Sequence, residues 1–272
     1  MTMIHSTALV SSKAQVDPTV EVGAYAVIDA GVVVGPRCRV GPHVYLTGAT
    51  VIGAGNQFHA GCVIGDAPQD LKYKGEPTSV VIGDDNVFRE GCTVHRSAKV
   101  EEATVIGSRN FLMVNSHVGH NAQVGDQVIL VNGALLAGHA HVGDRAFISG
   151  NCLVHQFVRV GTLAIMQGGS AVSRDLPPFT ISYGVNTTCG LNVIGLRRAG
   201  VKPDERMELK KVYRLLLHPG RNLNEALAEA RQQFTTASAK ILIEFIAASK
   251  RGICVHHGQA HGETQDDENI EL

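Results

Sequence analysis

Histidines are concentrated in the middle of this 272-residue chain, where their spacing could bring several imidazoles together. Of the 13 histidines, six lie between residues 95 and 155: His95, His117, His120, His139, His141 and His155. A neutral imidazole can take up and return a proton near neutral pH, which makes histidine the most frequent general acid or base in enzymes. The cluster therefore indicates acid–base chemistry, provided that the fold brings these side chains to one place.

The elements that carry the histidines repeat with a period of six residues. Every sixth residue from Ile4 to Val172 is apolar, except Asp70 and Glu76. Glycine often follows the apolar residue, and a small residue often stands two positions before it, including Cys38, Cys62, Cys92 and Cys152. A period of six fits neither an α-helix nor a two-faced strand, and it is typical of a parallel β-helix built from hexapeptides. We expect the apolar residue of every hexapeptide to point into this β-helix. We interpret these cysteines as small core residues and not as nucleophiles.

Three hexapeptides make one coil of about 18 residues, and coils stack at the strand spacing of about 4.8 Å. The repeat from residue 4 to residue 172 predicts roughly nine coils in a column of about 45 Å on that spacing. The break at 66–79 is polar and charged, and it predicts an excursion loop from one corner of the column. Loops held by a rigid scaffold often carry function.

The hexapeptide pattern ends at Asp175-Leu176-Pro177-Pro178, which divides the chain into two domains. We expect a β-helix domain at 1–177 and a C-terminal helical domain at 178–257. Helix-like apolar spacing predicts helices over 206–217, 223–234 and 237–250. Residues 258–272 are polar and acidic, and we expect a disordered tail there.

The coil length also predicts which side chains share a surface. Residues 18 apart stack on one column, so His120 should lie below Gly138 and Gly138 below Gln156. His139 and His155 flank this column. A lone histidine would be read as a solvated polar residue, whereas three on adjacent coils favour a functional site. Zinc binding is the competing interpretation, but we expect no carboxylate or cysteine on the column and predict no metal.

Five motifs occur in order along the chain: QDLKYKGEPT at 69–78, NSHVGH at 115–120, LAGH at 136–139, VHQF at 154–157 and GLRR at 195–198. Together they closely resemble the bacterial acyl-[acyl-carrier-protein]–UDP-N-acetylglucosamine O-acyltransferases of lipid A biosynthesis, a family of hexapeptide-repeat acyltransferases. The resemblance runs from the first hexapeptides into the C-terminal region. It implies a left-handed β-helix, followed by an α-helical domain, in a homotrimer with clefts between the subunits.

The resemblance implies transfer of an (R)-3-hydroxyacyl group from acyl carrier protein to the 3-position of UDP-N-acetylglucosamine, the first step of lipid A biosynthesis. A hydroxyl that attacks a thioester needs a base, and the tetrahedral oxyanion needs a preorganised donor. His120 matches the general base of the family, and Gly138 matches the residue whose backbone N–H is the oxyanion donor. No cofactor and no covalent acyl-enzyme are implied.

The resemblance also assigns substrate contacts to Gln69, Asp70, Lys72, His117, His139, His155, Gln156, Asn192 and Arg198. Gly168 matches the position that limits acyl-chain length, and its missing side chain is expected to leave room for a longer chain. Two positions depart from the family pattern. Many relatives have Asp where this chain has Asn121, and Ile194 stands where relatives often have Glu. The orientation of His120 and one nucleotide contact therefore remain open.

Four alternatives remain at this stage. A related acyltransferase could use a 3-amino UDP-sugar. An N-acyltransferase of the same pathway would carry a further N-terminal domain, for which the first hexapeptide at Ile4 leaves no room. A metal-dependent, carbonic anhydrase-like hexapeptide protein would hold a metal, and a β-helix scaffold would have no catalytic residues.

Charge and hydropathy exclude other classes of protein. The 24 Lys and Arg residues nearly balance the 25 Asp and Glu residues, which gives a net charge of −1 and no broadly basic surface for nucleic acid. No run approaches the ~18 apolar residues of a membrane span, and the first residues lack the segments of a signal peptide. We therefore expect a cytoplasmic protein without a transmembrane segment.

Overall fold

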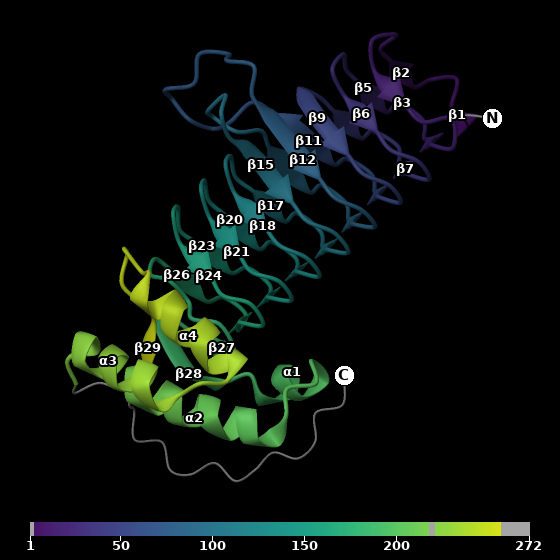
Figure 1. Ribbon diagram of the computed structural model, residues 1–272. Coiled ribbons are helices and arrows are strands. Elements are labelled where there is room, and N and C mark those ends of the chain that lie inside the picture. Colours follow the sequence, from purple (N-terminus) through teal and green to yellow (C-terminus); the bar gives the residue numbers. More distant parts are fainter. Residues whose placement is uncertain (1–2, 218–220, 257–272) are drawn as a thin grey trace.

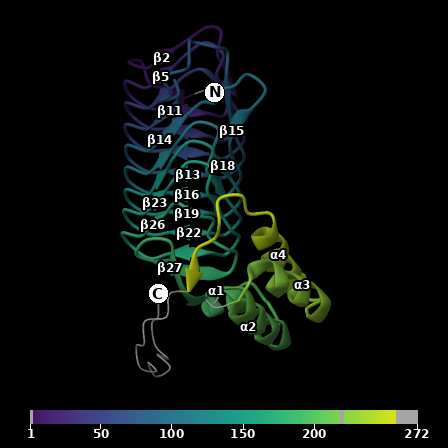
Figure 2. The same ribbon diagram turned by 90° about the vertical axis from the view of Figure 1, so that its left-hand side faces the viewer.

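The computed structural model describes residues 3–217 and 221–256 of the chain. From residue 3 to residue 172 the chain winds into a three-sided parallel β-helix (Figure 1), in which each side is one sheet of short, stacked strands. Helices lie at the C-terminal end of this column, and Figure 2 shows the coils stacked one on another above them. The tail predicted at 258–272 lies outside the described residues.

The three sheets take every third strand of the chain, which is the topology of a β-helix. The strands of sheet A within the column are β1 (Met3–Ile4), β4 (Glu21–Val22), β7 (Arg39–Val40), β10 (Gln57–Phe58), β13 (Val87–Phe88), β16 (Phe111–Leu112), β19 (Ile129–Leu130), β22 (Phe147–Ile148) and β25 (Ile165–Met166). Sheet B contains β2 (Leu9–Val10), β5 (Val27–Ile28), β8 (Tyr45–Leu46), β11 (Val63–Asp66), β14 (Thr93–His95), β17 (His117–Val118), β20 (Leu135–Leu136), β23 (Leu153–Val154) and β26 (Ala171–Val172). Sheet C contains β3 (Gln15–Val16), β6 (Val33–Val34), β9 (Ala49–Ile52), β12 (Ser79–Ile82), β15 (Ala103–Ile106), β18 (Gln123–Val124), β21 (His141–Val142) and β24 (Arg159–Val160).

The register of the strands gives the length of each coil. Most partners are 18 residues apart, as in the pair Val22 and Val40. Two coils are longer: Ile52 pairs with Ile82, and Ile82 pairs with Ile106. The first long coil contains the predicted excursion loop between β11 and β12. The second contains an insertion of one hexapeptide between β14 and β15, which was not predicted from the sequence.

Both insertions leave the column at the same corner, where sheet B passes to sheet C. We call them the 67–78 loop and the 96–102 loop. The prediction that every apolar residue of the series points inward was wrong at Val100, whose surface is 54% exposed. Val100 lies in the 96–102 loop, outside the stacked sides of the column. An insertion of six residues preserves the hexapeptide register and therefore does not disturb the pattern.

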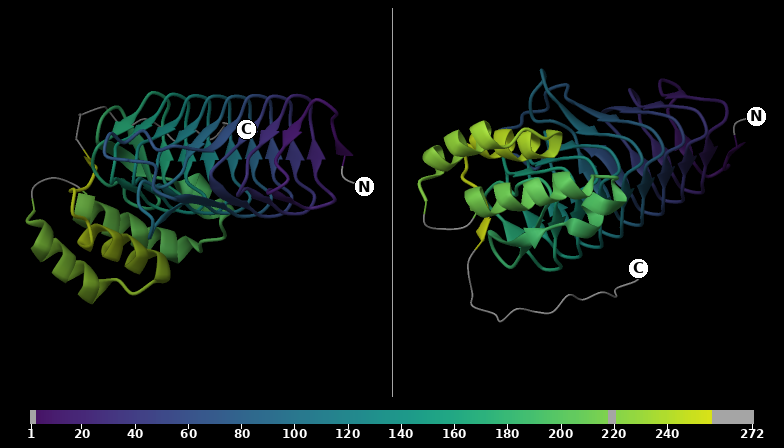
Figure 3. Two further views of the ribbon diagram at one scale, coloured as in Figure 1. Left: turned by 90° about the horizontal axis from the view of Figure 1, so that it is seen from above. Right: turned by 60° about the horizontal axis from the view of Figure 1, so that its bottom comes forward.

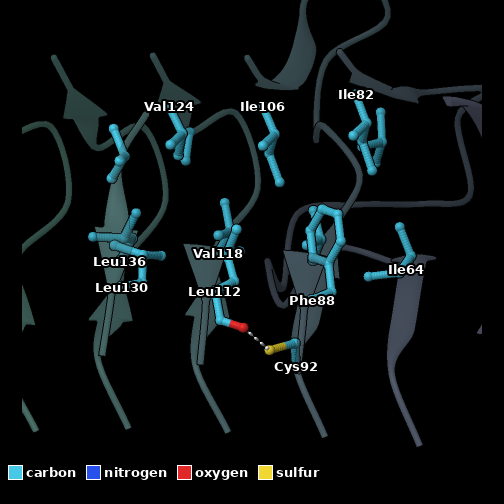
Figure 4. Packing of buried hydrophobic residues seen from close by; sticks show 14 of the residues in the cluster. Ile64, Ile82, Phe88, Cys92, Ile106, Leu112, Val118, Val124, Leu130 and Leu136 are labelled. Carbon is cyan, nitrogen blue, oxygen red and sulfur yellow. Dashed lines mark hydrogen bonds between the residues drawn. The ribbon is translucent and has the colours of Figure 1, made fainter. Parts of the chain in front are cut away.

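The interior of the column is filled by the apolar series and by small residues beside it. Figure 4 shows buried apolar side chains of successive coils stacked along the column. The rings of Phe58 and Phe88 stack with their centroids 4.8 Å apart. Cys38, Cys62, Cys92 and Cys152 are fully buried, as predicted for core residues. The Cys92 thiol donates to the carbonyl of Leu112 on the next coil at 3.3 Å. Burial also raises the pKa of the Cys38 and Cys152 thiols, which disfavours their reactive form.

Beyond the column the chain first makes a hairpin and then turns helical. Strand β27 (Thr180–Tyr183) extends sheet A beside β25, and β28 (Thr187–Leu191) and β29 (Val255–His256) continue it. The helices are α1 (Val193–Arg198), α2 (Pro203–Leu217), α3 (Leu223–Gln233) and α4 (Ala237–Ala247). Helices α2, α3 and α4 coincide with the three predicted helices to within three residues at each end, whereas α1 and the hairpin were not predicted.

Helices α2–α4 pack around their own apolar core at one end of the column (Figure 3). Arg159, which is held in place by an ion pair, joins this unit to the last coils. The Arg159 guanidinium donates two hydrogen bonds to the buried carboxylate of Asp175, at 2.7 and 2.9 Å. It also donates to the carbonyl of Phe245 in α4 and lies over the ring of the same residue. No helix among the described residues has both the length and the apolar character needed to cross a bilayer.

Candidate functional site

A cleft of about 570 Å³ runs along the corner between sheets B and C and onto the outer face of sheet B. We call it the corner cleft. Its lining contains the residues Gln69, His95, His117, Gly119, His120, Leu135, Leu136, Ala137, Gly138, Leu153, Val154, His155, Gln156, Ala171, Val172, Ser173 and Val185. Six site residues predicted from the sequence meet here: Gln69, His117, His120, Gly138, His155 and Gln156.

The backbone presents these side chains through one repeated turn. At the corner of three successive coils, Asn121, His139 and Phe157 adopt left-handed conformations with φ between 58° and 62°. Each left-handed residue turns the chain from a strand of sheet B to a strand of sheet C. The residue before it, which is His120 on the first of these coils, is held at the outside of the corner.

His120 and Gly138 face each other across adjacent coils, as the 18-residue spacing predicted. A Cβ atom placed on Gly138 would lie 2.6 Å from Nε2 of His120. No side chain other than hydrogen fits at this distance, so glycine lets the imidazole approach the backbone of the next coil. The His120 ring also contacts the edge of the His139 ring, with centroids 5.3 Å apart and planes at 87°.

The backbone N–H of Gly138 donates no hydrogen bond to any described residue. At another corner of the column the corresponding N–H groups are occupied, because Ala54 donates to Asp84, and Ser108 donates to Asp126 on the following coil. Next to His120 the corresponding donor is thus left available at the cleft. A backbone N–H beside a base is the pair of groups that acyl transfer requires.

Two further histidines form one wall of the corner cleft. The rings of His95 and His117 meet edge to face with centroids 5.0 Å apart, and Nδ1 of His117 lies 2.8 Å from the hydroxyl of Thr93. Burial lowers the pKa of His117 to about 4, with smaller contributions from His95 and His120. Burial likewise lowers the pKa of His95. Both rings are therefore neutral at physiological pH and can offer hydrogen bonds without charge.

His95 was not among the predicted site residues, although it lines the cleft. Its ring is 8% exposed, and its Nδ1 atom has no hydrogen-bond partner among the described residues. The pairing of Thr93 with His117 places it one coil below the other histidines. The 18-residue spacing could not predict that His95 is a neighbour of His117, because the 96–102 loop lengthens the coil between them.

An apolar stripe continues the cleft along the outer face of sheet B. The ladder aligns His117 with Leu135, Leu135 with Leu153, and Leu153 with Ala171 on successive coils. Leu135 is 40% and Leu153 is 49% exposed, although both are large apolar side chains. A polar end with histidines that passes into an apolar stripe is suited to a ligand with a reactive head and a hydrocarbon tail.

His139 and the residues of the 67–78 loop other than Gln69 do not line the corner cleft. His139 points to the sheet C side of the corner, where its ring stacks on Phe157 with centroids 4.5 Å apart. The Asp70 carboxylate accepts from the backbone N–H of Lys72 at 2.9 Å, inside the loop. Within one chain, the predicted substrate contacts Asp70, Lys72 and His139 therefore do not belong to the lining of the corner cleft.

Asn192 and Arg198 lie in a different cleft, beside the outer face of sheet A. Asn192 caps helix α1: its side-chain oxygen accepts from the N–H of Gly195 at 2.8 Å, and its amide donates to the carbonyl of Leu163 at 2.9 Å. Ile194 lines the same cleft and is half exposed. One chain alone does not bring these residues to His120.

Gly168 lies at the corner between sheets A and B, on the far side of the apolar stripe. It does not line the corner cleft of the single chain. The nearest atom to a Cβ placed on it would be the carbonyl oxygen of Gly150 at 3.7 Å, so a side chain could be accommodated without a clash.

A carboxylate that was not predicted as a neighbour approaches the histidines from the 96–102 loop, beside the column that His120, Gly138 and Gln156 form. Glu102, at the end of the 96–102 loop, accepts a hydrogen bond from the side chain of Asn121 at 2.7 Å and lies 4.0 Å from Nδ1 of His139. Its ion pair with Lys99, at 2.9 Å, lowers the pKa of Glu102 and keeps it ionised. Nevertheless, no three His, Cys, Asp or Glu side chains within 3–217 and 221–256 are arranged to hold a metal ion.

Several known proteins that are similar to this chain belong to one family. Residues 175–254 match the family described as UDP N-acetylglucosamine O-acyltransferase, domain 2. A protein of Syntrophobacter fumaroxidans named acyl-[acyl-carrier-protein]–UDP-N-acetylglucosamine O-acyltransferase is 42% identical over 254 residues, which cover 92% of this chain and 98% of the relative. A protein of the same name from Thermodesulfovibrio yellowstonii is 42% identical over 257 residues, covering 93% and 100%.

Solved structures agree with these sequence relatives. The UDP-N-acetylglucosamine acyltransferase of Francisella novicida superposes with a TM-score of 0.88 at 36% identity and covers 94% of both chains. The corresponding protein of Bacteroides fragilis gives a TM-score of 0.89 at 36% identity and covers 92% of this chain and 99% of its own. These likenesses confirm the predicted fold class, a left-handed parallel β-helix followed by a helical domain.

Proposed function

Because the chain belongs to the acyl-[acyl-carrier-protein]–UDP-N-acetylglucosamine O-acyltransferases, we propose that its corner cleft is the site of acyl transfer. The enzyme moves an (R)-3-hydroxyacyl group from acyl carrier protein to the 3-hydroxyl of UDP-N-acetylglucosamine, the first step of lipid A biosynthesis. The observation that carries the assignment of the site is the pairing of His120 with the available N–H of Gly138.

In the proposed mechanism His120 is the general base. Its Nε2 takes the proton of the sugar 3-hydroxyl while the hydroxyl oxygen attacks the thioester carbonyl. The carbonyl oxygen becomes an oxyanion that accepts a hydrogen bond from the N–H of Gly138. When the tetrahedral intermediate collapses, the C–S bond breaks, and the departing thiolate of the carrier takes the proton from His120. Every proton is returned, so the step needs no cofactor.

The apolar stripe is the proposed seat of the acyl chain. Leu135, Leu153 and Ala171 follow one another from the histidines toward the C-terminal end of the column. A hydrocarbon tail laid along them would cover leucine side chains that are 40% and 49% exposed in the single chain. His117, His155, Gln156 and Gln69 surround the reactive end, where polar groups of the donor and the sugar must be held.

A homotrimer accounts for the residues that one chain leaves apart. His120 lies at the corner of sheets B and C, whereas Asn192 and Arg198 lie beside sheet A. In a cyclic trimer of prisms, neighbouring copies face each other with different sides, so a cleft between two subunits can take catalytic residues from one and nucleotide contacts from the other. We infer that Arg198, whose guanidinium suits a diphosphate, acts on the sugar nucleotide of a neighbouring site.

The remaining loop residues and Gly168 belong to the same proposal. Asp70 and Lys72 contact the sugar from the 67–78 loop, His139 supports the substrate from the sheet C side, and Gly168 sets the length of acyl chain that fits between subunits. Cytoplasmic acyl carrier proteins and nucleotide sugars are the substrates, so we place the enzyme in the cytoplasm.

The test is an acyl-transfer assay with the purified protein. Acyl carrier proteins loaded with (R)-3-hydroxyacyl chains of several lengths are offered with UDP-N-acetylglucosamine or with its 3-amino analogue, and products are separated by mass. We expect an ester on the 3-hydroxyl with one preferred chain length. If product forms only with the 3-amino sugar, as an amide, then that sugar and not UDP-N-acetylglucosamine is the acceptor. No transfer to either sugar would overturn the proposal.

A further inference from the structure

The imidazole of His120 is held by the side chain that follows it in the sequence. Nδ1 of His120 lies 2.9 Å from Oδ1 of Asn121, and the opposite edge of the ring, with Nε2, faces Gly138 in the corner cleft. Asn121 is only 3% exposed, so its side chain is fixed by protein groups and not by solvent. What those groups are decides which nitrogen of His120 carries the proton.

The two ends of the Asn121 amide are distinguished by partners that can play only one role. The backbone N–H of Ala98 donates to Oδ1 at 2.9 Å, and a backbone N–H can only donate. On the other side, Nδ2 donates to the carboxylate of Glu102 at 2.7 Å, and an ionised carboxylate can only accept. Nδ2 also donates to the hydroxyl of Ser97 at 2.6 Å. The amide therefore cannot be turned around.

This orientation sets the tautomer of His120. Oδ1 of Asn121 has no proton to give, so the contact at 2.9 Å requires the proton on Nδ1 of His120. A neutral imidazole protonated at Nδ1 has its lone pair on Nε2. Nε2 is the atom that faces Gly138, and it is therefore unprotonated at the place where a hydroxyl must be activated.

The negative charge behind this arrangement comes from the 96–102 loop. Glu102 is ionised, because its hydrogen-bonded ion pair with Lys99 lowers its pKa. Ser97 of the same loop accepts from Asn121 and is itself oriented, because it donates to the carbonyl of Lys99 at 2.9 Å. The hexapeptide insertion thus wraps around Asn121 and supplies three of its partners: Ser97, Ala98 and Glu102.

We propose that Glu102 and Asn121 are positioning residues that form a relay from carboxylate to amide to imidazole, which holds Nε2 of His120 free and stabilises the imidazolium formed during acyl transfer. The inference rests on the proposed role of His120. A carboxylate at position 121 would place a negative charge directly beside the imidazole. In this chain Glu102 supplies that charge through Asn121. Neither residue touches the substrate: the proton of the sugar goes to Nε2, and the proton on Nδ1 stays where it is.

Exchanging the two functional groups tests the relay. Glu102→Gln keeps an acceptor for Asn121 but removes the charge, and we expect kcat to fall about tenfold with little change in KM. Asn121→Asp alone places a second carboxylate at the 2.7 Å contact with Glu102 and should also lower kcat. In the double variant E102Q/N121D the new amide at position 102 can donate to the new carboxylate at position 121. We expect this variant to recover to within about threefold of the wild type.

The matched control is Glu101→Gln, which removes a neighbouring exposed charge from the same loop and should leave kcat unchanged. If the fold-loss of kcat in the double variant equals the product of the fold-losses in the two single variants, the relay is overturned. A Glu102→Gln enzyme that behaves like the Glu101→Gln control would also overturn it.

A second readout does not depend on turnover. Long-range ¹⁵N–¹H correlation spectra of the imidazoles report which nitrogen of His120 is protonated. We expect Nδ1–H in the wild-type protein and loss of that preference in Asn121→Leu, which has no acceptor. Nε2–H in the wild type, or an unchanged tautomer in Asn121→Leu, would contradict the inference. If the wild-type protein shows the Nδ1–H tautomer but transfers no acyl group, the proposed function fails while the geometry stands.

Discussion

Nε2 of His120 and the backbone of Gly138 lie so close that a Cβ atom on Gly138 would come within 2.6 Å of the ring nitrogen. The two residues are 18 apart in the sequence and one coil apart in space. Their contact places Nε2 of His120 beside the backbone N–H of Gly138, which donates no hydrogen bond to any described residue. A single methyl group therefore suffices to separate the proposed base from the proposed oxyanion donor.

Gly138→Ala should reduce kcat by about 100-fold or more, because the methyl group displaces the imidazole or the donor by a fraction of an ångström to an ångström. The matched control is Gly150→Ala at another corner, where the nearest atom to the new Cβ is 3.5 Å away. Steady-state kinetics of both variants, with circular dichroism to verify folding, make the comparison. Equal activity of the two variants would remove Gly138 from the site.

Stability should depend on pH through His117. Its folded-state pKa of about 4 lies below the value of ~6.5 for an unfolded histidine. As pH falls from about 6.5 to about 4, the unfolded chain gains a proton that the folded protein cannot accept, so the folded state loses stability in this window. Above about 6.5 His117 is neutral in both states and contributes no pH dependence.

His117→Gln should flatten this dependence by about 1–2 kcal/mol between pH 7 and pH 4.5, because half-buried groups express only part of such a shift. Thermal unfolding across this pH range measures the slope, with His5→Gln, a substitution of an exposed residue at the N-terminal end of the column, as the control. His95 and His139, whose pKa values are also lowered by burial, preserve part of the slope. An unchanged slope in His117→Gln would show that its ring is solvated.

Gly168→Met should shift the preference of the enzyme toward shorter acyl donors. The site leaves room for a side chain, with the nearest atom to a new Cβ at 3.7 Å, so the variant should fold normally. A competition assay with 3-hydroxyacyl carriers of several lengths would reveal the shift in kcat/KM. No movement toward shorter donors would disconnect Gly168 from the acyl channel.

Mixing two inactive variants tests the proposed division of the site between subunits. If each cleft takes His120 from one subunit and Arg198 from its neighbour, the variants His120→Ala and Arg198→Ala complement each other in a mixed trimer. Co-refolding equal amounts should restore about a quarter of the wild-type turnover, because about one cleft in four receives both intact residues. Activity no higher than the sum of the separate variants would mean that each site is built within one chain.

The column and the reactive end of the corner cleft could be predicted from the sequence because a β-helix converts sequence spacing directly into spatial position. The contact of His120 with Gly138 and the burial of Cys92 follow from the period alone. The wrong prediction that Val100 points inward has the same origin. An insertion of one whole hexapeptide preserves the apolar register, so the 96–102 loop could not be detected from the pattern. Glu102 was missed as a partner of Asn121 for that reason.

Sequence spacing could not predict on which faces of the column the remaining site residues lie. His139 lies next to the column, but the left-handed turn directs its ring to the sheet C side and onto Phe157. Asn192 was expected to contact the substrate, and in the folded chain it caps α1, whose short length gave no periodic signal. Residues on different faces of one prism share a site only through assembly, which spacing within a single chain does not encode.

One comparison tests the catalytic role of His120 most directly. It measures the turnover of (R)-3-hydroxyacyl carrier with UDP-N-acetylglucosamine by the wild type, by His120→Ala and by His43→Asn. His43 lies at another corner with φ of 56°, a conformation that asparagine also tolerates, so its replacement controls for loss of a corner histidine. We predict that His120→Ala lowers kcat by about 10³-fold while remaining folded, and that His43→Asn stays near the wild type. A folded His120→Ala enzyme that retains wild-type turnover would contradict the assignment.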